Sequence, residues 1–286
     1  MNKLSLLFFC FLLTPCIYGQ KKLKLSTNGQ GTMFVHAGYN RSAYNRSDVE
    51  FSGGNYSFSL HQPTFSDTPE GVELSRFFHS SSMETFQLNV HVGYFVDHKW
   101  ALTLGYDRMN LFMQFDEPFI VSGNVAPEVH SKLSGGYDRQ SVDLEEQDLN
   151  YYQDKGINFF NAGVQRTDKW YRTKDASFSV NTIAKVGVGV VFSNSTYTFD
   201  GFTTENATGL SGVGAYANAG VRFDFFQHVF FQAGVSSGIL AQNNTSLRSI
   251  TNETAKQNTL FFSPQIAIGL SFFVRPTNAC NTCPQW

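Results

Sequence analysis

The residues in this chain that could do chemistry fall on one side of several alternating segments. Histidines, acids, bases and amides recur at every second position between apolar residues, so in strands they would point together into an enclosed interior. Buried charges must be paired, so we expect the two cations of this set to pair with its two acids. An ion-paired plug is favoured over a gated path for solutes or protons through the same groups. The set comprises His36, Asn89, His91, Asp107, Lys185, Asn218, Arg222, Asp224, Gln232 and Gln265.

A second group, His79, Ser81 and Glu84, lies in a serine-rich stretch. A histidine base beside a serine can activate the hydroxyl for acyl transfer. A histidine two residues before a serine is expected often by chance in such a stretch, and here it lies at a junction between loop and strand. The sequence therefore favours an ordinary loop, and these three residues are weak catalytic candidates.

Two other motifs could hold a metal. The segment DLEEQD (Asp143–Asp148) offers carboxylates that can bind calcium, but it lacks the glycine and the terminal glutamate of the EF-hand spacing. Cys280 and Cys283 form a CxxC motif without a second such pair or a nearby histidine, so zinc is not supported. A solvated loop and a local disulfide, formed in an oxidising compartment, are the favoured alternatives. The sequence therefore predicts no metal and no cofactor.

The elements that must position these residues are long alternating strands. The clearest is TLFFSPQIAIGLSFFV (Thr259–Val274), whose even-numbered residues are apolar and whose odd-numbered residues are mostly small or polar. It exceeds the roughly five or six residues of an ordinary strand and suits a tilted strand that crosses a bilayer, which needs about 9–11 residues. Because a strand in lipid needs both edges paired, further strands must close a barrel around it.

Other segments alternate in the same way and complete a set of eight strands. Short turns join the second strand to the third, the fourth to the fifth and the sixth to the seventh, whereas long polar segments such as residues 116–155 make the other connections. This asymmetry is typical of outer-membrane barrels, and a soluble barrel would instead be apolar inside. The predicted fold is an all-β, eight-stranded antiparallel up-and-down transmembrane β-barrel with short periplasmic turns and long extracellular loops. The other seven strands begin near Thr32, Phe86, Trp100, Ile157, Phe178, Val213 and Val229.

Composition and the chain ends agree with export to a membrane. Charged residues make up only 15 % of the 286, and no apolar run beyond the N-terminus is long enough for a transmembrane helix. Residues 1–19 have the pattern of a signal peptide, with Lys3 before an apolar run. Its removal changes the formal charge from −2 to −3, and nothing indicates nucleic-acid binding. We predict an N-terminal periplasmic linker, the barrel and a periplasmic tail over residues 20–30, 31–275 and 276–286.

The eight-strand plan resembles the small outer-membrane barrels of the OmpA/OmpX/OmpW type, over residues 30–275. The segment GYNRSAYNRSDVEFSGGNYSFSL (Gly38–Leu60) is similar to an uncharacterised group of barrels from Bacteroidota. Neither resemblance supplies a catalytic motif. Outer-membrane lipid A deacylases place a His-x-Ser pair and a Glu near the lipid, which is the resemblance behind a hydrolase role for the weak catalytic candidates. The chain departs from the usual pattern by continuing past its last strand with RPTNACNTCPQW (Arg275–Trp286).

These patterns imply a protein of the cell outer membrane with extracellular loops and periplasmic termini. We expect a non-enzymatic barrel with a plugged polar lumen, which acts through its loops and tail as a structural or accessory subunit of an outer-membrane complex. The expected partners are outer-membrane lipid, lipopolysaccharide and a protein of that complex. Two alternatives are a narrow channel for small solutes or lipids and a lipid A-type acyl hydrolase.

Overall fold

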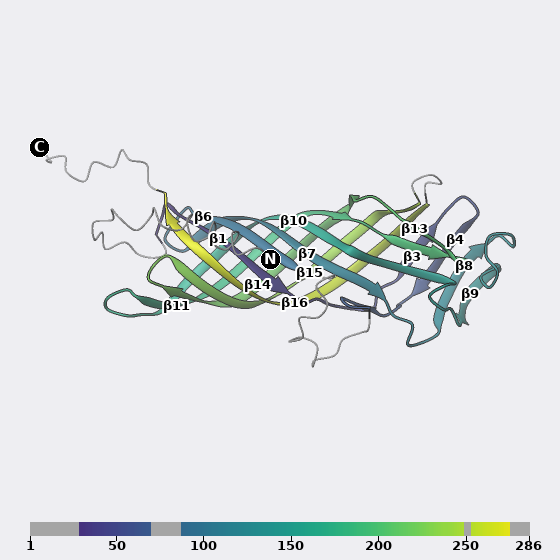
Figure 1. Ribbon diagram of the computed structural model, residues 1–286, viewed down its shortest axis with the longest axis horizontal. Helices are drawn as coiled ribbons and strands as arrows, with labels where there is room; N and C mark the ends of the chain where they lie inside the picture. Colours follow the sequence, from purple (N-terminus) through teal and green to yellow (C-terminus); the bar gives the residue numbers. More distant parts are fainter. Residues whose placement is uncertain (1–28, 70–86, 249–252, 275–286) are drawn as a thin grey trace, which may run out of the picture.

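The computed structural model describes residues 29–69, 87–248 and 253–274, and these residues form sixteen strands. Eight of the strands close an antiparallel ring, because the last of them pairs back onto the first. The ring confirms the predicted eight-stranded barrel (Figure 1). Within the described residues, no helix is long and apolar enough to cross a membrane. In ring order the strands are β1 (Thr32–Asn40), β6 (Leu88–Phe95), β7 (Trp100–Met113), β10 (Leu149–Arg172), β11 (Phe178–Ser193), β14 (Gly209–Phe225), β15 (Val229–Arg248) and β16 (Glu253–Phe273).

The other strands continue the wall beyond one end of the ring, on the right in Figure 1. There β5 pairs with β7, β12 pairs with β10, and β2 and β3 pair with β16, while β3 leads through β4 and β8 to β9. We call this part, with the strand ends that it contacts, the extension. Its own strands are β2 (Ala43–Tyr44), β3 (Val49–Ser52), β4 (Tyr56–His61), β5 (Phe65–Ser66), β8 (Phe119–Val125), β9 (Gly135–Val142), β12 (Thr196–Phe199) and β13 (Phe202–Glu205).

The long connections that the sequence predicts between the ring strands are present, but much of their length forms strands of the extension at three places. Residues 116–155 contain β8, β9 and the start of β10, and residues 193–212 contain β12 and β13. Residues 241–258 are largely the paired ends of β15 and β16. The short turns of the ring lie at its opposite end, which we call the turn end.

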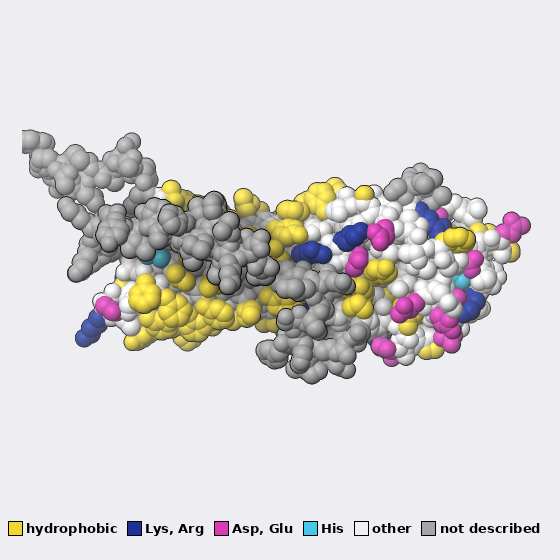
Figure 2. All heavy atoms as spheres, viewed as in Figure 1, with side chains coloured by type: hydrophobic (Ala, Val, Ile, Leu, Met, Phe, Trp, Pro, Cys, Tyr) yellow, Lys and Arg dark blue, Asp and Glu magenta, His cyan; other side chains and the backbone are white. Residues whose placement is uncertain are grey.

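Apolar side chains cover the outside of the ring. Leu104 and Ile268 are 68 % and 64 % exposed, whereas their inward neighbours Thr103 and Ala267 are buried. Figure 2 shows hydrophobic side chains gathered over this half of the molecule. A band of exposed apolar residues flanked by aromatic side chains is the pattern of a barrel that spans a bilayer. At the turn end the flanking aromatics are Tyr94, Trp100, Trp170, Tyr171 and Phe226.

The extension has the opposite polarity, with an apolar interior and a polar surface. The side-chain direction does not change along β16, where Leu260 still points outward and Phe261 inward. The next outward residues, Asn258 and Lys256, are polar and exposed. The same strand therefore passes from a hydrocarbon-facing to a water-facing surface by a change of residue type alone. The core of the extension includes Val49, Phe51, Tyr56, Phe58, Leu60, Leu149, Tyr151, Tyr197, Phe199 and Leu247.

This boundary predicts that a lysine introduced on the outward face of β16 has different effects on the two sides of it. Ile268→Lys should destabilise the folded barrel by about 2–4 kcal/mol, because a lysine would face hydrocarbon. Asn258→Lys, ten positions nearer the extension, should have little effect because that site faces water. Urea unfolding in lipid vesicles measures both. Equal stability of the two variants would contradict the assignment of the apolar band.

Candidate functional site in the barrel interior

The residues predicted to point inward all lie within the ring, in layers stacked along its axis. Asp107 and Gln265 are partly accessible, and the others are buried. The layer nearest the turn end contains Arg222 and Asp224. The middle layer contains His36, His91, Asp107, Lys185 and Gln232. A third polar layer, which includes residues not predicted from the sequence, lies under the core of the extension.

A buried arginine forms the centre of the first layer. The guanidinium of Arg222 lies 2.7 Å from the Asp224 carboxylate and donates to the Ser271 hydroxyl at 2.8 Å. Its Cζ atom stacks 3.5 Å from the ring centroid of Phe230 and 5.4 Å from that of Phe34. Arg222, Phe230 and Phe34 each have no accessible surface. This layer therefore fills the cross-section of the ring near the turn end.

In the middle layer a lysine reaches an acid through a histidine. Lys185 Nζ lies 3.1 Å from His91 Nδ1, and His91 Nε2 lies 3.0 Å from Asp107 Oδ1. The arrangement assigns the proton to Nε2, which donates to Asp107, and leaves Nδ1 to accept from the ammonium group. Asn161 donates to the other carboxylate oxygen at 2.8 Å, and Tyr216 donates to Asn161 at 2.9 Å.

This geometry corrects part of the predicted pairing. Arg222 pairs with Asp224 as expected, but Lys185 forms no direct ion pair with either predicted acid in the described residues. Its neighbour on the adjacent strand β14 is Asn218, and its side chain instead crosses the interior to His91 on β6. The expected direct pairing of Lys185 with an acid was wrong, because an inward side chain of this length reaches across the narrow lumen to His91.

The first and middle layers each contain one acid and one lysine or arginine side chain, and both are densely filled. A cavity of about 10 Å³ remains between Asp107, Ser236 and Gln265, close to the lower limit for one water molecule. His36 and His91 pack with ring centroids 5.0 Å apart, and His36 Nε2 contacts the Gln232 amide at 3.3 Å. A hydrogen-bonded chain from lysine to carboxylate can hold a proton, but the arginine layer beneath it closes the interior. The arrangement favours a plug.

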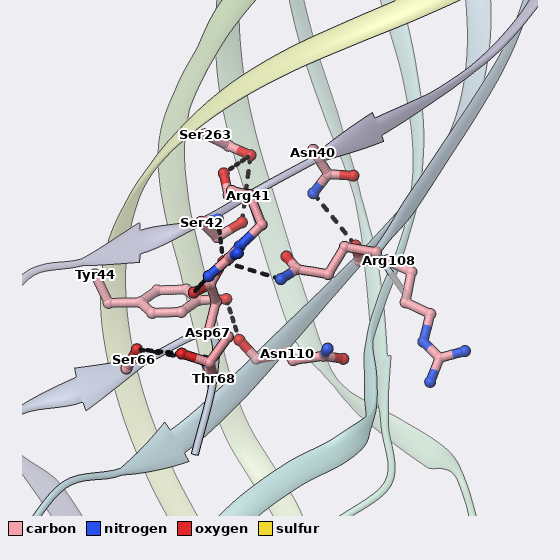
Figure 3. Close-up of polar contacts among 11 residues, drawn as sticks. Asn40, Arg41, Ser42, Tyr44, Ser66, Asp67, Thr68, Arg108, Asn110 and Ser263 are labelled. Atoms are coloured by element: carbon pink, nitrogen blue, oxygen red, sulfur yellow. Dashed lines mark hydrogen bonds and ion pairs between the residues drawn. The ribbon is translucent and has the colours of Figure 1, made fainter. Parts of the chain in front are cut away.

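The third layer centres on a buried carboxylate that no sequence motif singles out. Asp67 accepts hydrogen bonds from Arg41 Nε at 2.6 Å and Nη2 at 2.8 Å, from the Ser42 backbone N–H at 2.8 Å and from Gln87 Nε2 at 2.9 Å (Figure 3). Tyr44 donates to the Asn110 carbonyl at 2.6 Å beside it. Asp67 thereby ties together the chain after β1, after β5 and before β6.

Several predicted candidates cannot be placed. His79, Ser81, Glu84, Cys280 and Cys283 lie outside the described residues.

In the acidic segment, Asp148 accepts from Lys132 Nζ at 2.6 Å and from the Glu145 backbone N–H at 2.9 Å, so its carboxylate is engaged. Over the described ranges, no group of three or more His, Cys, Asp or Glu side chains could hold a metal ion.

Removing the arginine of the first layer should be strongly destabilising. Arg222→Ala leaves Asp224 buried without its counter-charge, which costs about 3–5 kcal/mol of unfolding free energy. The double variant Arg222→Ala/Asp224→Ala should recover part of that loss, because the orphaned carboxylate is gone. Urea unfolding of both variants in vesicles measures the difference. A single variant as stable as the wild type would contradict the role of this pair.

Removing the charge of the Asp67 carboxylate in the third layer should also be strongly destabilising. Asp67→Asn removes the carboxylate charge that faces the buried Arg41 guanidinium and should cost several kcal/mol, on the order of 3–5. Faster hydrogen exchange at the Ser42 amide should accompany the loss. Asp138→Asn, on the exposed strand β9, is the control and should change neither quantity. Equal behaviour of the two variants would show that Asp67 does not hold these segments together.

No protein-family model matches this chain, and no curated protein is similar to it. Among solved structures, the outer membrane protein OprG of Pseudomonas aeruginosa is 12 % identical, with 86 % of this chain and 97 % of OprG covered and a TM-score of 0.38. Outer membrane protein AlkL, in lipid bilayers, is 11 % identical, with 91 % and 99 % covered and a TM-score of 0.37. Ail, the attachment invasion locus protein of Yersinia pestis, is 10 % identical, with 85 % and 99 % covered and a TM-score of 0.34. At these identities and TM-scores the likeness has no bearing on what this chain binds or transports.

Proposed function

We propose that this protein is a sealed barrel of the outer membrane that holds a rigid binding platform, the extension, outside the cell. In this role it is a structural or accessory subunit of an outer-membrane complex and conducts no solute. The observation that carries the proposal is the reversal of polarity between the ring and the extension. One half is built to face hydrocarbon, and the other is built as a water-soluble domain.

The packing of the extension supports a platform rather than a set of loops. Phe51 stacks on Phe58 and on Tyr197 with centroid distances of 5.2 and 5.7 Å, and Tyr56 stacks on Phe199 at 4.9 Å. Aromatic pairs of this kind add to the stabilisation from buried area. A surface held rigid by such a core loses little conformational entropy when a partner binds.

A cleft in the extension offers one place for such contacts. Its volume is about 430 Å³, which lies within the roughly 300–1,000 Å³ of ligand sites. Tyr56, Glu128, Phe202, Arg248 and Glu253 are among the residues that line it, and Phe202 is 73 % exposed. Segments far apart in the sequence thus meet around a mixed aromatic and charged surface.

The filled interior argues against the alternative of a narrow channel. The arginine layer, the Lys185–His91–Asp107 layer and the Asp67 layer lie one above another, and the apolar core of the extension lies above them. An eight-stranded ring is just wide enough for side chains to fill it. For the hydrolase alternative, the candidate residues lie outside the described ranges and no observation favours it.

Surface labelling tests the orientation. Asp138→Cys in β9 should react with a membrane-impermeant maleimide on intact cells, because the extension is outside. Lys174→Cys, in the short turn after β10, should react only after the outer membrane is permeabilised. The chain without an introduced cysteine is the control for Cys280 and Cys283. The opposite labelling pattern would reverse the proposed orientation.

Single-channel recording tests the closed interior. The purified wild-type barrel in a planar bilayer should show no stepwise conductance, because buried side chains fill every layer. A barrel of the same preparation that migrates differently in SDS before and after boiling provides the control for correct folding. Reproducible conductance steps from such a folded sample would support the channel and contradict the proposal.

A further inference from the structure

Arg108 lies on the outer surface of the ring, at the edge of its apolar band. Leu104, Tyr106 and Arg108 share the outward side of β7, while Asp107 between them points into the interior. Across the pairing with β10, Arg108 lies opposite Asn158, two positions beyond the exposed Phe160. Figure 2 shows Lys and Arg side chains where the hydrophobic surface gives way to the polar surface of the extension.

The Arg108 side chain lies against a bulge in β10. The pairing between β7 and β10 shifts register between Gln153 and Ile157, and Gly156 adopts a φ of 96° there. A Cβ atom at Gly156 would lie 2.8 Å from both Cγ and Nε of Arg108, so only glycine leaves room for the side chain. Arg108 Nη2 donates to the Asp154 carbonyl at 3.2 Å. Figure 3 shows the Arg108 side chain directed away from the buried Asp67 cluster.

Among the described residues, Arg108 has no counter-charge of the kind that the interior arginines have. Arg41 and Arg222 each contact a carboxylate, at 2.6 and 2.7 Å, whereas Arg108 forms no ion pair with any described residue. The nearest acid of the bulge, Asp154, accepts instead from the Lys155 backbone N–H at 2.8 Å, and Lys155 Nζ pairs with Glu205 at 2.7 Å. The Nε of Arg108 is buried without an acceptor.

We propose that Arg108 is the anchor of a binding site for the phosphate of a lipid headgroup in the outer leaflet. A charged side chain on the lipid face of a barrel is costly unless it reaches the interface and finds a counter-charge. Headgroup phosphates lie where the hydrocarbon band ends, and the planar guanidinium group matches phosphate oxygens in geometry and charge. The site rests on the proposed membrane orientation, which places the extension outside.

Native mass spectrometry of the full-length barrel from phosphatidylglycerol nanodiscs tests the site. Arg108→Gln should retain roughly tenfold less lipid than the wild type, since one charge-assisted hydrogen-bonding group is lost. Arg108→Lys should keep part of the binding because the charge remains. Gly156→Ala should also weaken retention by displacing the arginine. Lys256→Gln removes an exposed cation on the outward side of β16 and should leave retention unchanged.

Two outcomes would overturn the site. The first is wild-type lipid retention by Arg108→Gln, or an equal loss in Lys256→Gln, in samples that migrate as closed barrels. The second is displacement of the lipid by inorganic phosphate at matched concentration, which would assign a site for free phosphate instead. Surface labelling of Asp138→Cys in the same Arg108→Gln chain separates this failure from a failure of the proposed function. Loss of lipid together with reversed labelling would keep a phosphate site at Arg108 but overturn its assignment to the outer leaflet.

Discussion

The strict alternation of side chains along a β-strand is the constraint on which the rest of this structure depends. A closed ring satisfies the backbone hydrogen bonds that lipid cannot satisfy, and the ring fixes which residues face in and which face out. Because β16 runs unbroken into the extension, it carries this assignment with it, whereas bulges interrupt β10 and β15. The same wall faces hydrocarbon along one part of its length and water along the other. The outward residues must therefore change from apolar to polar at one level along the barrel axis, and the type of inward residue must change there too. Leu260 and Asn258 on the outside of β16 mark that height.

The interior layers follow from the same constraint. Below the boundary the inward face holds small and polar residues, which leaves charges to be buried, and each must be compensated. Asp224 neutralises Arg222 directly, and Asp107 compensates Lys185 through His91. Above the boundary, inward apolar residues such as Phe51 and Tyr151 form a core, with buried polar residues such as Gln257 beside it. The Asp67 cluster lies between the polar layers of the ring and the core of the extension. At this level, residues that follow β1 and β5 take the place of β6 in the wall.

The ring could be predicted from the sequence because a period of two with an apolar outer face is a local signal. The faces of β1, β6, β11 and β16 follow directly from it. Most of the extension was missed because its strands are short and their apolar residues point inward. Segments such as Val49–Ser52 and Phe119–Val125 lie between polar stretches that resemble loops. The Arg222–Asp224 pair is two positions apart on one strand and was predictable. The contacts of Lys185 with His91 and of Arg41 with Asp67 join distant segments, and no local pattern encodes them.

Hydrogen–deuterium exchange on the barrel in lipid bilayers tests most directly whether one wall serves two solvents. Amides of the paired strands in the extension, such as those of Phe51, Phe58 and Tyr197, should be protected nearly as well as those of the ring, because an apolar core covers them. Exchange of these amides at the rate of open loops, with protection confined to the ring, would show that the extension is not a folded platform and would contradict the reversal of polarity.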